Sequence, residues 1–351
     1  MKGIVFLGKR QVELREFDDP TPGPRDVVLE IRASGMCGTD LKAYRPKFEP
    51  GIVRGGIKRA STPQIAGHEP CGVVVEVGSA VTEREARVGQ RVMDHHYDGC
   101  GVCRHCQSGW SQMCDDGAIV FGSVAHGAHA KYMRVPAHTL VPLPDSLSFE
   151  AGAAISCGTG TAYGALKRLG LEGDETLAVF GQGPVGLSAT QLGVAMGARV
   201  IAIDISPERR QMALNMGADV AFDPMTVDPV QAIKDLTHGE GAHKTLDSSS
   251  SPDARRAAVR VTRAWGSACF VGEGGQVILE VSPDLIRRQV TLMGHWTFSK
   301  VGQADCARFV SDRKIDVDGL FSHKWSLDQA DEAYKLFDLQ KTGKGVFLPQ
   351  A

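Results

Sequence analysis

A glycine-rich turn between an apolar strand and an Ala- and Leu-rich helix places the strongest constraint on how this chain can fold. The apolar run 177–180 leads directly into a GxGxxG pattern. In this context the glycines permit a tight turn and the close approach of a pyrophosphate, which faces the first N–H groups of the helix. A strand–helix turn without a ligand is the alternative. The pattern predicts a dinucleotide site that includes Gly181, Gly183, Pro184, Val185 and Gly186.

A second apolar strand, residues 200–203, ends in Asp204. This position is about the right distance along the chain for a carboxylate that bonds the adenosine ribose hydroxyls. A carboxylate there repels the extra phosphate of NADP, so the sequence favours NAD. Arg209 and Arg210 follow closely and weaken this preference, because an Arg can accept a 2′-phosphate. Asp204 is also interpretable as a helix cap ahead of Pro207.

From Ala151 onward, apolar strands alternate with Ala- and Gly-rich helical stretches. The alternation indicates a parallel doubly wound sheet, an α/β architecture. A chain of 351 residues is too long for one ordinary core, so a second domain is expected. The predicted strands are residues 176–180, 199–203, 219–222 and, last in the sheet, 291–294.

The first 150 residues contain short strands separated by Gly and Pro, which indicates a β-barrel-like domain. A helix opening at Ser326 and running through Phe337, then a strand at 345–348, are expected to return to this domain. The predicted division is a catalytic domain of residues 1–150, completed by 295–351, and a dinucleotide domain of residues 151–294. The strands expected in the first domain include residues 27–32, 72–78 and 91–93.

Four of the nine cysteines lie within fifteen residues of one another. Four thiolates so close together predict a closed tetrahedral zinc site, which is structural because no position remains for a substrate. His105 replacing one cysteine, or four unrelated thiols, are the alternatives. The remaining Cys71, Cys269 and Cys306 are interpreted as packing residues. The predicted structural ligands are Cys100, Cys103, Cys106 and Cys114.

A thiol and an imidazole suited to zinc stand at Cys37 and His68, and a third thiol, Cys157, lies far downstream. Three protein ligands with one open position are typical of a catalytic zinc. Thr39 has a hydroxyl that could relay a proton, and Asp40 could accept a hydrogen bond from the ligand imidazole. Each residue alone is more simply explained as part of a core, so the prediction depends on their combination.

These motifs occur in one order over nearly the whole chain, and the sequence resembles the zinc-containing medium-chain alcohol dehydrogenases. The resemblance implies a GroES-like β domain beside a Rossmann domain, two zinc ions per chain, and NAD. It implies that Cys37, His68 and Cys157 hold the catalytic zinc, which Glu69 can approach. It also implies contacts to nicotinamide from Thr161, Val271, Gly272, His295, Trp296 and Thr297.

The sequence also departs from the family pattern. Lys42 stands where many members have a His that completes the proton relay. The long loop 44–62 carries five cations, including Arg54, against one acid, and is either solvated or recognises a polar or anionic substrate. Strand alternation places either His95 or His96 towards the cleft, and the resemblance favours His96, where many members carry an apolar or aromatic wall; an ordinary surface or core His is the alternative. We treat His96, Lys42 and Arg54 as candidate substrate contacts.

The predicted activity is the reversible oxidation of a secondary or polar alcohol, of the polyol or hydroxy-acid type. Alternatives are a threonine 3-dehydrogenase-like enzyme, a primary-alcohol or aldehyde reductase using NADP, a zinc-free quinone reductase and a non-enzymatic NAD-binding protein. Net charge near zero argues against nucleic acid, and no apolar run reaches the ~20 residues of a membrane helix. A cytoplasmic homo-oligomer, a tetramer or dimer, is expected.

Overall fold

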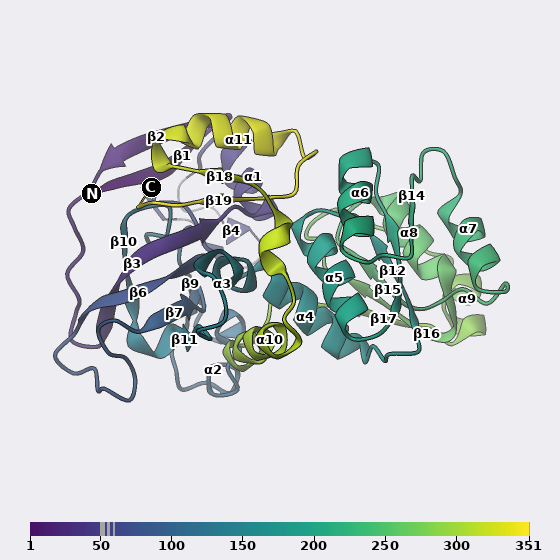
Figure 1. The fold of residues 1–351 in the computed structure, drawn as a ribbon, viewed down its shortest axis with the longest axis horizontal. Coiled ribbons are helices and arrows are strands. Elements are labelled where there is room, and N and C mark those ends of the chain that lie inside the picture. Colours follow the sequence, from purple (N-terminus) through teal and green to yellow (C-terminus); the bar gives the residue numbers. More distant parts are fainter. Residues whose placement is uncertain (50–52, 55–56, 59, 351) are drawn as a thin grey trace. The chain divides into compact units, whose positions relative to one another are not determined.

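The computed structural model of the chain describes residues 1–49, 53–54, 57–58 and 60–350; the side chains of residues 53, 54, 57 and 58 lie outside that description. The chain divides into two compact units. Unit 1 comprises Met1–Gly160, Phe298–Gln340 and Lys344–Ala351, and unit 2 comprises Thr161–Thr297 and Lys341–Gly343. Figure 1 shows the elements of both units along the chain.

The first boundary lies after residue 160, ten residues beyond the predicted position after 150. Helix α3 (Phe149–Ile155) belongs to unit 1 because its small residues are buried against the sheet of that unit. A Cβ on Gly152 would come within 2.4 Å of Cys71 Sγ, and Ser156 Oγ donates to the Pro70 carbonyl at 2.9 Å. The second boundary likewise lies at Thr297 and not at 294.

Unit 1 is built on a seven-stranded sheet in the order β11-β7-β6-β3-β19-β18, with β10 also paired to β3. The predicted strands near residues 27, 72 and 91 lie in β3, β6 and β7, and the C-terminal strand β19 returns to unit 1 as expected. The sheet consists of β3 (Asp26–Gly35), β6 (Pro70–Val77), β7 (Arg91–Asp94), β10 (Tyr132–Pro136), β11 (Leu140–Pro142), β18 (Phe321–Trp325) and β19 (Lys344–Phe347).

The other helices and strands of unit 1 surround this sheet. They are β1 (Lys2–Gly8), β2 (Gln11–Glu16), α1 (Leu41–Tyr44), β4 (Val53–Arg54), β5 (Ile57–Lys58), β8 (Tyr97–Asp98), α2 (Arg104–Gln107), β9 (Ile119–Val120), α10 (Lys300–Arg313) and α11 (Ala330–Asp338). Figure 1 shows α11 alongside the hairpin of β1 and β2, and α11 packs on β2.

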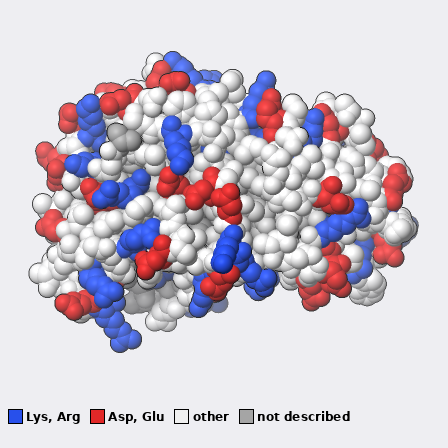
Figure 2. Space-filling view, in the orientation of Figure 1, with Lys and Arg blue, Asp and Glu red and all other residues white. Residues whose placement is uncertain are grey.

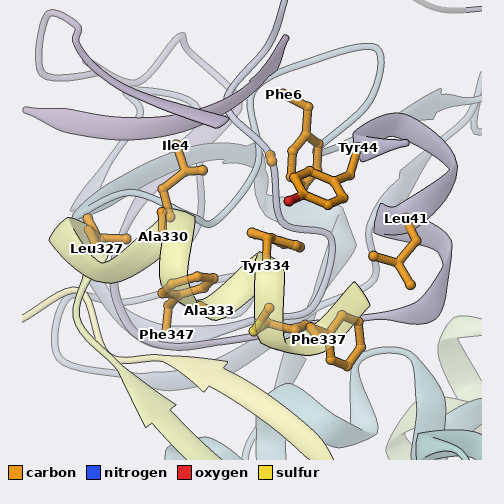
Figure 3. Close-up of a cluster of buried hydrophobic side chains, with 12 residues drawn as sticks. Ile4, Phe6, Leu41, Tyr44, Leu327, Ala330, Ala333, Tyr334, Phe337 and Phe347 are labelled. Atoms are coloured by element: carbon orange, nitrogen blue, oxygen red, sulfur yellow. The ribbon is translucent and has the colours of Figure 1, made fainter. Parts of the chain in front are cut away.

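An aromatic cluster under α11 forms one core of unit 1. Figure 3 shows Tyr334 of α11 among side chains from β1, α1 and β19. Its ring lies 4.8 Å from Phe6, 5.6 Å from Tyr44 and 5.9 Å from Phe347, measured between centroids. Edge-on and tilted ring contacts of this kind hold an aromatic side chain in one orientation.

Unit 2 contains a six-stranded parallel sheet in the order β14-β13-β12-β15-β16-β17. The predicted strands at residues 176, 199 and 291 match β12, β13 and β17, and the order reverses beside β12, where doubly wound sheets bind ligands. The strands are β12 (Thr176–Phe180), β13 (Arg199–Ile203), β14 (Val220–Phe222), β15 (Ala242–Asp247), β16 (Thr262–Phe270) and β17 (Thr291–Gly294).

In unit 2, α5 packs with α6 and α7 packs with α8, and Figure 1 shows these two pairs on either side of the strands. They cover an almost wholly buried β12, as a parallel sheet requires. The helices are α4 (Gly158–Leu169), α5 (Pro184–Ala195), α6 (Pro207–Asn215), α7 (Pro229–Leu236), α8 (Pro252–Val261) and α9 (Val281–Asp284).

On the face shown in Figure 2, acidic and basic side chains are interspersed. None of the described helices is both long enough and apolar enough to span a bilayer.

Candidate functional site: a thiolate–imidazole centre and a dinucleotide turn

The end of β3 presents the first candidate ligand. Met36 N donates to the Gly345 carbonyl at 2.9 Å, so β19 fixes the chain where β3 ends. Cys37 then begins a short 3₁₀ turn, Gly38–Asp40, and its N–H donates to Asp40 Oδ2 at 2.9 Å. This turn buries the Asp40 carboxylate behind the Cys37 thiol and leaves Thr39 exposed.

Three remote segments bring their metal-binding atoms together in unit 1. One ligand atom each from Cys37, His68, Glu69 and Cys157 lies within 4.8 Å of all the others. The two sulfurs are 3.8 Å apart. Tetrahedral zinc with bonds of about 2.3 Å to sulfur separates two sulfurs by about 3.8 Å, so the donor set fits this ion. Thr39 Oγ1 lies 3.2 Å from Cys37 Sγ and 3.1 Å from His68 Nε2.

The protonation of these groups suits a cation. The contact with Cys157 puts the pKa of Cys37 well below its ordinary value, against the effect of burial, and the contact with Cys37 raises the pKa of Cys157. Burial disfavours charge on His68, but Cys37 and Asp40 together raise its pKa well above the ordinary value. Metal ligands bind in their deprotonated forms, so a divalent cation at this cluster would displace the protons of the thiol and of the imidazole.

Glu69 is held away from solvent beside this cluster. Its Oε2 forms an ion pair with the buried Lys344, whose ammonium also donates to the Met36 carbonyl at 3.1 Å. Its Oε1 has no hydrogen-bond partner among the described residues. Burial raises the pKa of Glu69 to about 8, and Lys344 opposes the shift. A Cβ on Gly35 would lie 1.9 Å from Glu69 Oε2, so only glycine leaves room for this carboxylate.

The predicted contact between Asp40 and His68 is present, with Asp40 Oδ1 3.2 Å from His68 Nδ1. The structure adds partners that sequence analysis missed. Tyr334 donates to Asp40 Oδ2, and His129 lies next in the same chain of hydrogen bonds. Lys344 was missed as well. None of the three carries a metal-binding motif, so the sequence held no signal for them.

The four-cysteine lobe is assembled as predicted: one sulfur each from Cys100, Cys103, Cys106 and Cys114 lies within 4.8 Å of the others. Backbone N–H groups point at these sulfurs, with Cys103 N 3.4 Å from Cys100 Sγ and Cys106 N 3.5 Å from Cys103 Sγ. The N–H groups of Cys106 and Asp115 lower the pKa of Cys103 to about 6. His105 instead lies 3.8 Å from Asp115 and is not in the cluster. Cys71, Cys269 and Cys306 are buried in packing positions.

In unit 2 the glycine turn has the form that a dinucleotide needs. Gly181 has a φ of +87°, and a Cβ on Gly186 would lie 1.8 Å from the Gly181 carbonyl. Gly183 is the N-cap of α5, with Pro184 and Val185 in its first turn. The turn therefore depends on glycine twice and ends at the N–H groups of a twelve-residue helix.

Asp204 at the end of β13 is held rigidly. Its Oδ2 accepts from Gln182 N at 2.5 Å and its Oδ1 from Ser206 N at 2.8 Å. Arg210 donates to the Asp204 carbonyl and pairs with Asp223, so this cation is engaged elsewhere. Arg209 donates to the Thr342 carbonyl at 3.0 Å, and a Cβ on Gly183 would come within 3.9 Å of its guanidinium.

The segments expected at the nicotinamide lie together at neighbouring strand ends. Val271 and Gly272 follow β16, and His295, Trp296 and Thr297 follow β17, which pairs with β16 up to Gly294. His295 also packs beside Gly164 of α4, the helix that contains Thr161. Sequence analysis missed the buried Asp247–Arg255 pair, in which Arg255 Nε lies 3.1 Å from Asp247 Oδ2 and a second nitrogen donates to the Gly272 carbonyl at 2.5 Å.

Of the substrate candidates, His96 alone is placed beside the ligand cluster. It is buried, its ring centroid lies 5.1 Å from that of His68, and its Nδ1 lies 3.0 Å from the Ser156 carbonyl. Nδ1 must donate in this bond, so Nε2 keeps a lone pair. Lys42 is exposed on α1, and the side chain of Arg54 lies outside the described residues. Arg45 of the same loop pairs with Asp338.

Comparisons with known proteins match this arrangement. The alcohol dehydrogenase GroES-like domain model matches residues 23–145, and the zinc-binding dehydrogenase model matches residues 184–312. YphC of Escherichia coli, described as an uncharacterized zinc-type alcohol dehydrogenase-like protein, is 38% identical over 349 residues, covering 99% of this chain and 98% of its own. This chain belongs to the zinc-type alcohol dehydrogenase family.

Two further relatives of this dehydrogenase are informative. The L-threonine 3-dehydrogenase of Pyrococcus horikoshii is 32% identical over 345 residues, covering 96% of this chain and 94% of its own. A putative zinc-binding dehydrogenase of Sinorhizobium meliloti, solved bound to NADP, superposes with a TM-score of 0.86 at 26% identity, covering 99% of each chain. The predicted family is thus confirmed, and so is the α/β fold with GroES-like and Rossmann domains. The chain is an oxidoreductase acting on CH–OH groups.

Proposed function

We propose that the dehydrogenase uses zinc and NAD to oxidise a secondary or polar alcohol reversibly. The observation that carries this proposal is the convergence of Cys37, His68 and Cys157, with the two sulfurs at the spacing that tetrahedral zinc requires. These three residues would hold the catalytic ion, with Glu69 as an additional acid beside it. Cys100, Cys103, Cys106 and Cys114 would hold a second, structural zinc.

The catalytic zinc supplies Lewis acidity towards an alcohol oxygen, and nicotinamide supplies the hydride acceptor. The residues of the chain supply orientation and proton handling. The Thr39 hydroxyl lies within hydrogen-bond distance of two ligand atoms, so it would accept a hydrogen bond from the substrate hydroxyl and relay its proton. In this relay Thr39 would receive the substrate proton as it passes its own hydroxyl proton to solvent, to which Thr39 is exposed. Asp40 keeps the imidazole of His68 turned so that Nε2 faces the site.

NAD as the cofactor is supported by the fixed carboxylate of Asp204, which would meet the adenosine ribose. Arg210 is engaged with Asp223, which removes one of the two cations that favour NADP. Arg209 remains near the glycine turn, and the Sinorhizobium meliloti protein is solved with NADP. Measuring kcat/KM with both dinucleotides decides the preference, and a higher value with NADP would contradict the proposal.

A polar alcohol is supported by His96, which leaves an imidazole nitrogen with a lone pair in a buried position beside His68. An acceptor in such a place favours a substrate with a further hydroxyl or ammonium group, as in a polyol or a hydroxy amino acid. Oxidation of threonine is the second candidate, favoured by the relative named L-threonine 3-dehydrogenase. A cytoplasmic homo-oligomer, a dimer or tetramer, completes the proposal.

Replacing one ligand tests the catalytic site directly. Wild-type protein is expected to carry about two zinc ions per chain, and Cys37→Ser about one, because the four-cysteine site is untouched. Activity should fall by at least about a thousandfold, since removing a ligand removes the Lewis acid. Cys71→Ser, which alters a buried thiol outside both clusters, is the control. Equal zinc content in wild-type and Cys37→Ser protein would refute the assignment.

A further inference from the structure

Behind the candidate metal site, a buried chain of hydrogen bonds continues from the imidazole of His68 through four more side chains. Asp40 contacts His68 with one carboxylate oxygen and accepts from the Tyr334 hydroxyl with the other, at 3.0 Å. The Tyr334 oxygen lies 2.7 Å from His129 Nε2, and His129 Nδ1 lies 2.7 Å from Ser34 Oγ. This series of hydrogen bonds thus connects the turn after β3, helix α11, the segment before β10 and β3 itself.

The bond that Tyr334 donates to Asp40 sets the direction of the bonds beyond it. Because the one hydroxyl proton of Tyr334 points to Asp40, the Tyr334 oxygen accepts from His129 Nε2–H, and His129 Nδ1 accepts from Ser34. His68 likewise donates from Nδ1, which leaves on Nε2 the lone pair that a metal ligand needs. Burial lowers the pKa of His129 to about 4, so the ring is neutral, as this arrangement requires.

Asp40 is the point at which this chain meets two candidate ligands. Its carboxylate bonds the imidazole of His68 and the backbone N–H of Cys37. Asp40 is 5% exposed and Tyr334 and His129 are fully buried, so water is not at hand to replace a missing donor. If the Tyr334 hydroxyl is removed, Cys37 N–H is the one donor left to Asp40 Oδ2 among the described residues, so the carboxylate is held less firmly beside both candidate ligands.

The Tyr334 ring is held by packing and does not depend on its hydroxyl. Figure 3 shows it in the aromatic cluster, where Phe6, Tyr44 and Phe347 surround it. Tyr334→Phe therefore removes the hydrogen bonds that the hydroxyl makes with Asp40 and His129, and it leaves no cavity of side-chain size. Tyr44 is equally buried in the same cluster, but its hydroxyl is not part of the chain to Asp40, so Tyr44→Phe is a matched control.

We propose that Tyr334, itself held by His129, is a positioning residue that orients Asp40 and, through it, the imidazole of His68 for metal binding. The proposal rests on His68 being a zinc ligand, as in the proposed function. The role is confined to geometry, because the series of side-chain hydrogen bonds links Tyr334 and His129 to Asp40, to each other and to Ser34, and reaches His68 through Asp40.

The test measures metal binding and the ligand field, not only turnover. Zinc affinity is measured by competition with a chelating dye, and the cobalt-substituted protein is examined by visible absorption. The spectrum of cobalt-loaded Cys37→Ser, which retains the four-cysteine lobe, is subtracted to isolate the site at His68. Tyr334→Phe is expected to lower the zinc affinity by about tenfold, which is the lower end of the loss seen when a hydrogen-bond partner of a metal-bound His is removed. The cobalt absorption bands are expected to shift or broaden. Tyr44→Phe is expected to do neither.

The outcomes separate this proposal from the one on which it rests. If wild-type and Cys37→Ser proteins give the same metal content and cobalt spectrum, the ligand assignment is wrong and both proposals fall. If those two differ, but Tyr334→Phe and Tyr44→Phe match each other in zinc affinity and spectrum, the function stands and the positioning role is refuted.

A second pair of variants tests the direction of the bonds. In His129→Gln an amide N–H can still donate to the Tyr334 oxygen, whereas His129→Leu has no donor. Zinc affinity is expected to be lower in His129→Leu than in the wild type. The loss in His129→Gln should be no more than half of the loss in His129→Leu, compared on a logarithmic scale. Equal zinc affinities in the two variants and the wild type would overturn the role of His129.

Discussion

At the scale of single residues, the carboxylates beside the candidate metal ligands are held by side chains from distant parts of the chain, since Tyr334 bonds Asp40 and Lys344 pairs with Glu69. Cys37 and His68 belong to residue types that bind zinc, so the sequence motifs around them predicted a metal site. Tyr334, His129 and Lys344 are ordinary core or surface types, and each reaches the site from more than fifty residues away. Their roles arise from the fold, which no local pattern expresses.

Asp94 in β7 gives a prediction at this scale. Its Oδ1 accepts from Thr139, but its Oδ2 has no partner among the described residues, and burial raises its pKa to about 7. Because the pKa is raised in the folded state, its contribution to stability is full in acid and is lost as the pH rises towards 7. Asp94→Asn should therefore unfold less readily than wild type at pH 8, with a gain that grows from about pH 4 to 7 by up to about 1.4 kcal/mol per pH unit.

Denaturant unfolding at pH 4.5, 6 and 8 measures this gain. Asp174→Asn, a change of the same kind at an exposed carboxylate, serves as the control and should leave the pH dependence unaltered. A constant difference between Asp94→Asn and wild type across these pH values would show that Asp94 does not titrate as described.

At the level of elements, strands with unbroken apolar sequence were located closely, and strands with polar residues were missed. β12 and β13 have such apolar runs, and their bounds match the prediction. In β15, the first residue, Ala242, is followed by His243 and Lys244, residue types that are common on protein surfaces. In the structure Lys244 pairs with Glu175 and His243 accepts from Thr176 N, both at the start of the neighbouring β12. These partners compensate for polarity that local sequence counts against a strand.

Helix α8 gives a prediction at this scale, because its Arg255 joins two strand ends of the sheet. Arg255 pairs with Asp247, which is fully buried, and donates to the Gly272 carbonyl. Arg255→Ala leaves a buried carboxylate without its cation, which should lower the free energy of unfolding by roughly 3–5 kcal/mol. Arg256→Ala removes a neighbouring Arg with an exposed ion pair and should change stability by less than about 1 kcal/mol.

Thermal and denaturant unfolding compare the two variants, and equal losses would show that the Asp247–Arg255 pair has no special weight. The KM for the dinucleotide should rise in Arg255→Ala, because Gly272 lies in the segment proposed to meet nicotinamide.

At the scale of the whole molecule, the candidate metal ligands and the glycine turn lie in different units. The candidate metal ligands all belong to unit 1, and the residues of the glycine turn, with Asp204, belong to unit 2. The two parts of the chemistry are therefore carried by separate cores. Unit 1 extends to residue 160 and not only to 150, because α3, which begins the Ala- and Gly-rich region, packs on β3 and β6 of unit 1.

Metal removal tests this separation. Chelation of the catalytic zinc should abolish turnover while the affinity for NAD, measured by calorimetry, changes by less than about threefold, since no residue of the dinucleotide site is a ligand. Adding back one equivalent of zinc should restore activity. Loss of NAD binding in parallel with the metal would contradict the assignment of the two sites to independent units.

Strand β19 lies between β3 and β18, and it carries Lys344, which neutralises Glu69. It pairs Val346 with Gly35 and Phe347 with Ser34, at the very end of the strand that leads to Cys37. During translation, Cys37 is thus synthesised some three hundred residues before the strand that pairs with the end of β3. The surroundings of Cys37 and Glu69 therefore form only after β19 has been synthesised, so this part of unit 1 cannot fold in the order of translation.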